Sequence, residues 1–131
     1  MRLYLDSSAI VKLVQTERES EALTRYLRSR RDDRQVSSAL ARVEVVRAVQ
    51  RGGVAAVTNA RRQFSRMSLL PIHRNLLDEA ADLELAGLRS LDAVHLASAR
   101  RLGDELRAVL TYDVRMQAAA EGLGLPTAAP V

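Results

Sequence analysis

The stretch RLYLDSSAIVKLVQ, residues 2–15, sets the pattern that the rest of the chain repeats. It begins with a short apolar run of strand length, and Asp6 ends that run. After this acid, the apolar side chains of Ile10, Leu13 and Val14 recur at helical spacing. The stretch therefore predicts a strand that leads directly into a helix, with an acidic residue at the junction.

The same alternation continues to the end of the sequence. The expected strands are residues 2–5, 35–37, 68–72, 107–111 and 125–129. The expected helices are residues 7–15, 18–31, 39–51, 54–66, 75–86, 90–103 and 113–121. Short apolar strands that alternate with helices predict an α/β fold, here a three-layer α/β/α arrangement around a short-stranded, mainly parallel sheet. We expect one domain over residues 1–131, because the chain contains no repeat or linker.

Glycine, proline and serine residues predict where several elements end. Pro71 indicates that the strand at 68–72 lies at an edge of the sheet. Gly52–Gly53 should separate two helices, and Gly87 should directly follow the helix at 75–86. Ser90 is expected to cap the next helix.

The composition excludes several classes of protein. Hydrophobic residues make up 47% of the chain and charged residues 27%, which is ordinary for a globular protein and excludes a disordered one. No stretch of about 18 residues lacks charge, so no membrane span is expected. There is no cysteine, which excludes disulfides, a thiol nucleophile and a thiolate metal site. The apolar run at the start is too short for a signal peptide, so we expect a cytoplasmic protein.

Charge is distributed unevenly along the chain. Residues 1–66 carry 14 basic and 7 acidic side chains, whereas residues 67–131 carry 6 basic and 9 acidic ones. Lys12 is the only lysine among the 20 basic residues. An arginine-rich first half suits a polyanionic partner, although it also suits a simply solvated surface. Aromatic residues make up only 3%, which disfavours nucleic-acid binding on a base-stacking platform.

Two aspartates follow predicted strands. Asp6 comes directly after the strand at 2–5, and Asp113 comes shortly after the strand at 107–111. In parallel α/β sheets the functional crevice lies outside the carboxyl ends of the strands, so both positions favour a functional site. Each aspartate could instead serve only as the N-cap of the helix that follows it.

Two further acids lie in apolar helices. Glu44 lies within ALARVEVVRAVQ, where a carboxylate is costly to bury unless it is paired or bound to metal. The alternative is an exposed ion pair with Arg47 or Arg51. Asp92 lies in the first turn of the helix that begins near Ser90, where an acid can also simply stabilise the helix dipole.

Together the four acids predict a metal site. Converging carboxylates repel one another, and a divalent cation removes that conflict. Oxygen ligands without cysteine favour Mg²⁺ or Mn²⁺ over zinc. His95, one turn after Asp92, is interpreted as a packed core histidine rather than a metal ligand.

Four segments of the sequence resemble the PIN-domain ribonucleases, especially the VapC toxins of bacterial toxin–antitoxin pairs. The segments are LYLDSSAIVKL, SSALARVEVVRA, LRSLDAVHLASA and VLTYDVRMQAAAEGLGL, in the order that the family has them. The resemblance covers essentially the whole chain. It implies a Mg²⁺- or Mn²⁺-dependent endoribonuclease that cleaves structured RNA, such as tRNA or rRNA, through metal-activated water.

The resemblance also implies roles for particular residues. Asp6 and Asp92 would bind the metal directly, and Asp113 directly or through water. Glu44 would bind the metal through water and orient the nucleophile. Further candidates are Ser7 and Thr111, as hydroxyls that orient the carboxylates, and Lys12 and Arg115, as contacts to the RNA backbone.

The family's usual partner is a small antitoxin of the VapB type. We expect it to lie against helices within residues 8–30 and 39–66 and to place one Arg or Lys near the acids. A homodimer, and binding of promoter DNA only through the antitoxin complex, are further expectations, and no membrane contact is expected. The main alternative is a catalytically inactive PIN-like module that binds RNA or protein. A phosphoacceptor signalling domain is disfavoured, because no acid lies between Glu44 and Asp78.

Overall fold

Five parallel strands form the centre of the protein, as seen in a computed structural model that describes residues 1–131. The strands are β1 (Arg2–Leu5), β2 (Arg34–Ser38), β3 (Ser68–Leu70), β4 (Leu106–Leu110) and β5 (Thr127–Ala128). Their order in the sheet is β3-β2-β1-β4-β5. Strands β2 and β3 follow on one side of β1, and β4 and β5 lie on its other side, so the strand order reverses between β1 and β4. Ligands usually bind at such a point of reversal.

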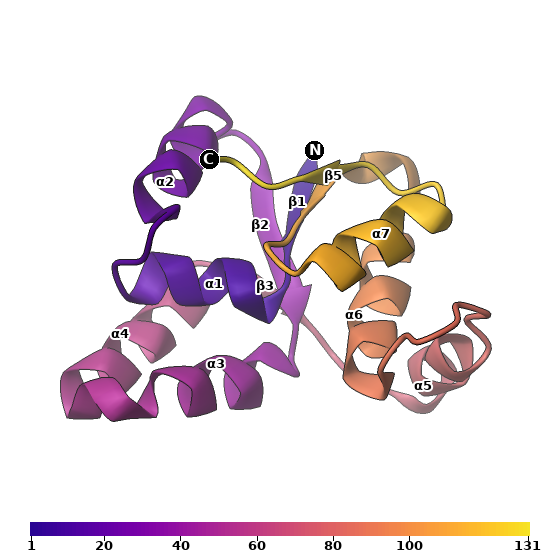
Figure 1. Ribbon diagram of the computed structural model, residues 1–131, viewed down its shortest axis with the longest axis horizontal. Coiled ribbons are helices and arrows are strands. Elements are labelled where there is room, and N and C mark those ends of the chain that lie inside the picture. The colour runs from indigo at the N-terminus through magenta and orange to yellow at the C-terminus, as the bar shows by residue number, and fades with distance from the viewer.

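Helices cover both faces of the sheet, so the predicted three-layer α/β/α architecture is confirmed (Figure 1). The helices are α1 (Ser7–Val14), α2 (Ser20–Ser29), α3 (Ala41–Val49), α4 (Gly53–Phe64), α5 (Arg74–Ala81), α6 (Ser90–Arg100) and α7 (Val114–Gly122), with short 3₁₀ turns η1 (Gln50–Gly52) and η2 (Gly103–Glu105). Helices α1 to α4 lie on one side of the sheet and α5 to α7 on the other (Figure 1).

Alternation along the strands sends neighbouring side chains to opposite faces. Leu3 and Leu5 of β1 join the larger core, which includes residues of α1 to α4. Tyr4, between them, joins a second core with Val109 and with Ala99 of α6. A strand buried on both faces has no polar positions, which explains why β1 appears in the sequence as a continuous apolar run.

Most predicted elements lie within a few residues of their observed places. The prediction that the strand near Pro71 is an edge strand is confirmed, because β3 is the outermost strand and ends at Leu70. Gly53 has a φ of 76°, a left-handed conformation that glycine adopts without strain, and it joins η1 to α4 as expected.

Two predicted helix boundaries are wrong. Helix α5 ends at Ala81 and not at residue 86, so Gly87 lies in a loop, although its φ of 77° is left-handed. Leu83 of this loop packs onto the core and continues the helical spacing of Leu76 and Ala80. Arg89, and not Ser90, is the N-cap residue of α6.

No helix in the structure is both long enough and apolar enough to span a lipid bilayer.

Candidate functional site

The candidate site lies at the carboxyl ends of the two central strands. Asp6 directly follows β1, and its backbone N–H donates to the Leu110 carbonyl at the end of β4 at 3.1 Å. Asp113 follows β4 three residues later. Parallel pairing of β1 with β4 thus brings together two acids that are far apart in the sequence.

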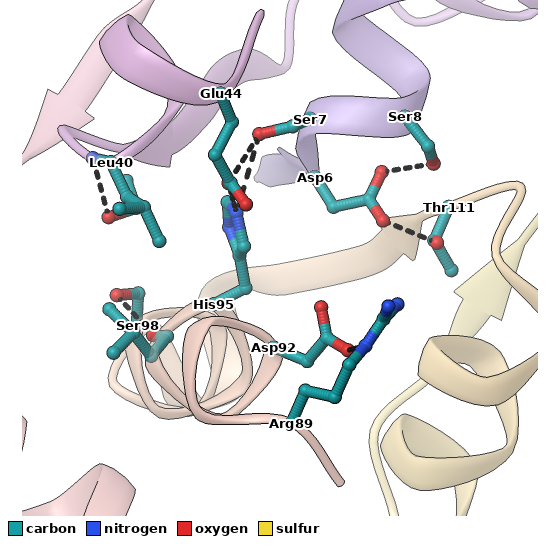
Figure 2. A network of polar contacts seen from close by, with 12 residues as sticks. Asp6, Ser7, Ser8, Leu40, Glu44, Arg89, Asp92, His95, Ser98 and Thr111 are labelled. Carbon is teal, nitrogen blue, oxygen red and sulfur yellow. Dashed lines mark hydrogen bonds and ion pairs between the residues drawn. The ribbon is translucent and has the colours of Figure 1, made fainter. Parts of the chain in front are cut away.

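Asp6 is a buried carboxylate held by three donors. Its Oδ1 accepts hydrogen bonds from the Ser8 hydroxyl at 2.7 Å and the Ala9 backbone N–H at 3.0 Å. Its Oδ2 accepts from the Thr111 hydroxyl at 2.5 Å (Figure 2). The residue is only 3% exposed, and burial raises the pKa of Asp6 more than these hydrogen bonds lower it. These hydrogen bonds therefore compensate only part of the cost of burying a negative charge on Asp6.

Asp113 is connected to Asp6 through Thr111. The backbone N–H of Asp113 donates to the Thr111 hydroxyl oxygen at 3.1 Å, and that hydroxyl donates onward to Asp6. The Oδ1 of Asp113 caps α7 by accepting from the backbone N–H groups of Arg115 and Met116 at 2.9 and 3.2 Å. Asp6 likewise caps α1. Asp6 and Asp113 thus each cap a helix and also lie at the functional edge of the sheet.

Asp92 and Asp113 share a cation, the guanidinium of Arg89. Arg89 donates from Nε to Asp92 at 3.3 Å and from Nη2 to Asp113 at 3.4 Å. Asp92 lies in the first turn of α6, and Figure 2 shows its carboxylate beside the Arg89 side chain. Arg89 was not among the residues predicted from the sequence, although its position three residues before Asp92 is a spacing that pairs side chains at a helix start.

Glu44 projects from α3 toward α1 and α6. Its Oε1 accepts from the Ser7 hydroxyl at 2.7 Å and contacts Nε2 of His95 at 2.6 Å. Partial burial acts to raise the pKa of Glu44, but the hydrogen bond and charge of His95, together with Ser7, outweigh it and lower the pKa. The alternative of an exposed ion pair with Arg47 or Arg51 is wrong, because neither arginine contacts Glu44.

His95 is buried, as expected of a core histidine, but it does more than pack. It is 2% exposed, and its two ring nitrogens contact Glu44 on one side and the Tyr4 hydroxyl on the other, the latter at 2.8 Å. Tyr4 and Ser8 also belong to the site and were missed. No spacing in the sequence connects Tyr4 with His95, which lie 91 positions apart.

Three further predicted site residues already have partners in the structure. Thr111 bonds Asp6 as predicted for an orienting hydroxyl, whereas Ser7 bonds Glu44. The Lys12 ammonium is paired with Glu17 and Glu19 at 3.3 and 2.7 Å, so its contact with RNA stays a prediction.

Arg115 is exposed and lies in the wall of a hollow of about 520 Å³. Asp92 lines the same hollow, which otherwise consists of small and apolar residues of α7 and of the loop before α6. A basic side chain thus adjoins the acidic edge.

The acids fit a hard cation by their chemistry, although they do not yet form a ligand cluster. The donors at the edge are carboxylate and hydroxyl oxygens, which suit Mg²⁺ or Mn²⁺. Arg89 already places a positive charge between two of them. As the side chains stand, no group of three or more His, Asp or Glu side chains could hold a metal ion. Binding of a metal would therefore require Arg89 to move and the carboxylates to turn toward one another.

These features define an α/β protein with an acidic edge at the centre of a parallel sheet. The PIN domain family matches residues 3–122, and the chain belongs to this family. Ribonuclease VapC46 of Mycobacterium tuberculosis (strain ATCC 25618 / H37Rv) is 51% identical over 128 residues, which is 98% of this chain and 97% of the relative. Ribonuclease VapC35 of the same strain is 41% identical over 133 residues, 98% of this chain and 96% of the relative.

A solved structure has the same fold. The crystal structure of Mycobacterium tuberculosis VapC20, described as a toxin that cleaves the sarcin-ricin loop, superposes with a TM-score of 0.73. The match covers 89% of this chain and 94% of VapC20, at 18% sequence identity. It supports the assigned architecture.

Proposed function

We propose that this protein is a Mg²⁺- or Mn²⁺-dependent endoribonuclease and the toxin of a VapBC-type toxin–antitoxin pair. The observation that carries the proposal is the buried carboxylate of Asp6, which lies beside Thr111 and Asp113 at the central edge of the sheet. The 51% identity to Ribonuclease VapC46 across nearly the whole chain supports the same activity.

Each acid has a separate part in the proposed reaction. Asp6 and Asp92 would hold the metal directly, Asp113 directly or through water, and Glu44 through water. When bound, the ion would polarise the scissile phosphate and lower the pKa of a coordinated water. Thr111 and Ser8 orient Asp6 through hydroxyl hydrogen bonds. Glu44, with its lowered pKa, is ionised and can accept a hydrogen bond or a proton from an attacking water.

The substrate and partners are proposed on the family resemblance. They are structured RNA, such as tRNA or rRNA, and a VapB-type antitoxin, with a homodimer and promoter DNA bound only through the antitoxin complex. The arginine-rich first half of the chain would help to attract RNA. Action on cellular RNA would take place in the cytoplasm.

A cleavage assay tests the activity and separates it from the alternative, an inactive module that binds RNA or protein. Purified protein is incubated with total tRNA and ribosomal RNA, with Mg²⁺ or with EDTA. We expect cleavage only with Mg²⁺, and its loss in Asp6→Asn. The matched control is Asp104→Asn, since Asp104 is exposed and lies just before the amino end of β4, away from the site. Metal-independent cleavage, or full activity of Asp6→Asn, would refute the proposal.

A further inference from the structure

A chain of hydrogen-bonded side chains runs from the buried core to Glu44. The Tyr4 hydroxyl lies 2.8 Å from Nδ1 of His95, and Nε2 of His95 lies 2.6 Å from Oε1 of Glu44. The Ser7 hydroxyl donates to the same Oε1 at 2.7 Å. The contacts join β1, α6, α3 and α1, and Figure 2 shows the His95 ring directly beneath Glu44.

The direction of these hydrogen bonds follows from the groups at the two ends. An ionised Glu44 can only accept a hydrogen bond. Burial raises the pKa of the Tyr4 hydroxyl, so this group keeps its proton and is available to donate. In a neutral imidazole, Nδ1 then accepts from Tyr4 and the Nε2–H donates to Glu44. Tyr4 and Glu44 thus fit the same ring tautomer, the one that can hold the carboxylate.

The arrangement constrains Glu44 on one oxygen only. Both donors, Ser7 and His95, contact Oε1, and no protein group donates to Oε2. The Glu44 side chain is 25% exposed, so its second oxygen remains available to a water or ion. Tyr4 is 0% and His95 2% exposed, so neither residue can contact an RNA strand.

We propose that Tyr4 and His95 are positioning residues that fix the orientation of Glu44 for ribonucleolytic cleavage, with Tyr4 holding the His95 ring in place through Nδ1. The inference rests on the proposed function, because the reaction for which Glu44 is positioned is the proposed cleavage of RNA. It gives the buried histidine of α6 a role that packing alone would not require.

Variants of the two residues separate positioning from packing. His95→Leu fills similar volume but cannot donate, and His95→Gln offers an amide N–H that can reach Glu44. For His95→Leu we expect a fall in kcat of about 10–100-fold with little change in KM for RNA, the range seen when groups that orient active-site ligands are removed. His95→Gln should restore part of kcat. Tyr4→Phe should give a smaller loss, since the imidazole remains.

The matched control for Tyr4→Phe is Tyr112→Phe. It also removes a hydrogen-bonded tyrosine hydroxyl, one that donates to the Pro130 carbonyl at 2.8 Å, and it should leave kcat unchanged. Folding of each variant is checked by circular dichroism and thermal unfolding. Equal kcat in folded His95→Leu and unsubstituted protein would overturn the inference.

The ring tautomer provides a readout that does not depend on activity. The chain has only two histidines, so ¹⁵N spectra can be assigned by comparison with His73→Asn. In the full-length protein at alkaline pH we expect His95 to be protonated at Nε2, the nitrogen that faces Glu44. An Nδ1-protonated ring in the unsubstituted protein would overturn the inference. If the protein cleaves no RNA, the proposed nuclease function fails, and with it the assigned role of Tyr4 and His95. The spectra then still decide which ring nitrogen of His95 donates to Glu44.

Discussion

Thr111 donates a hydrogen bond of 2.5 Å to Asp6, across 105 positions of the sequence, and both side chains are buried. The same hydroxyl accepts from the backbone N–H of Asp113. One small side chain thus serves two of the four acids and connects the ends of β1 and β4.

Thr111→Val should therefore destabilise the metal-free protein. Valine matches threonine in shape but leaves Oδ2 of Asp6 and the Asp113 N–H each without a partner. A buried group left unpaired costs about 1–3 kcal/mol, so we expect a loss of that order in urea unfolding with EDTA. Thr111→Ser keeps the hydroxyl and should lose less. Equal losses for Val and Ser would show that the methyl group, and not the hydrogen bonds, matters.

Asp6→Asn should make the metal-free protein more stable at neutral pH. Burial raises the pKa of Asp6 above its ordinary value of 3.8, so the folded state binds the proton more tightly than the unfolded state. The unsubstituted protein then loses stability as pH rises from the ordinary value through the raised one. Asparagine does not ionise, and it can still cap α1.

Thermal midpoints measured in EDTA over a pH series test this prediction. The advantage of Asp6→Asn should grow as pH rises through that window and stay constant above it. An unsubstituted protein that gains stability relative to the variant over the same window would contradict a raised pKa.

Arg89→Gln should bind Mn²⁺ more tightly than the unsubstituted protein. Arg89 is paired with Asp92 and Asp113, so a metal ion must compete with the guanidinium for both carboxylates. The Arg89 side chain is 65% exposed, and exposed ion pairs contribute only about 0.2–1 kcal/mol each. The gain in affinity should thus be modest, about 3–10-fold for two such pairs.

Calorimetric titration of the metal-free protein with Mn²⁺ measures this affinity. Arg100→Gln is the matched control, since Arg100 lies at the far end of α6 and makes no ion pair. Weaker Mn²⁺ binding by Arg89→Gln would mean that Arg89 supports the metal site and does not compete with it.

The sequence predicts the acidic edge because its signals are local. Asp6 and Asp113 each end an apolar run, and parallel strands bring their carboxyl ends to one edge whatever the details of packing. Glu44 could be recognised because a carboxylate in an apolar helix needs a partner. The partner itself could not be predicted, since His95 lies 51 positions away and the rotation of α3 about its axis depends on tertiary packing.

The end of α5 shows a different limit. Leu83 continues the helical spacing of Leu76 and Ala80, but it is partly buried from a loop. Hydrophobic periodicity reports burial and not hydrogen bonding, so a packed loop next to a helix is easily mistaken for its continuation. That loop leads to Arg89, which explains why the cation of the site was missed.

Capture of the antitoxin should depend on exposed apolar side chains of α3 and α4. Val43 of α3 is 57% exposed and Val54 of α4 is 85% exposed, both within the expected docking region of residues 39–66. Val43 directly precedes Glu44, so a segment lying there would pass close to the acids and could place an Arg or Lys among them. Arginine suits this position because its planar fork can pair with two carboxylates. The protein encoded beside this gene is the candidate antitoxin, and it can be co-expressed and purified with the toxin.

In that complex, Val43→Asp and Val54→Asp should each weaken binding by about tenfold or more, as expected for residues at the centre of an interface. The matched control is Leu77→Asp, which introduces the same charge at a 47% exposed leucine of α5, on the other side of the sheet. Because the inserted basic residue would occupy the acidic edge, bound antitoxin should also reduce Mn²⁺ binding, and its Ala variant should restore it. Loss of the complex in Leu77→Asp, with both valine variants still bound, would place the antitoxin on residues 67–131 and refute the predicted docking surface.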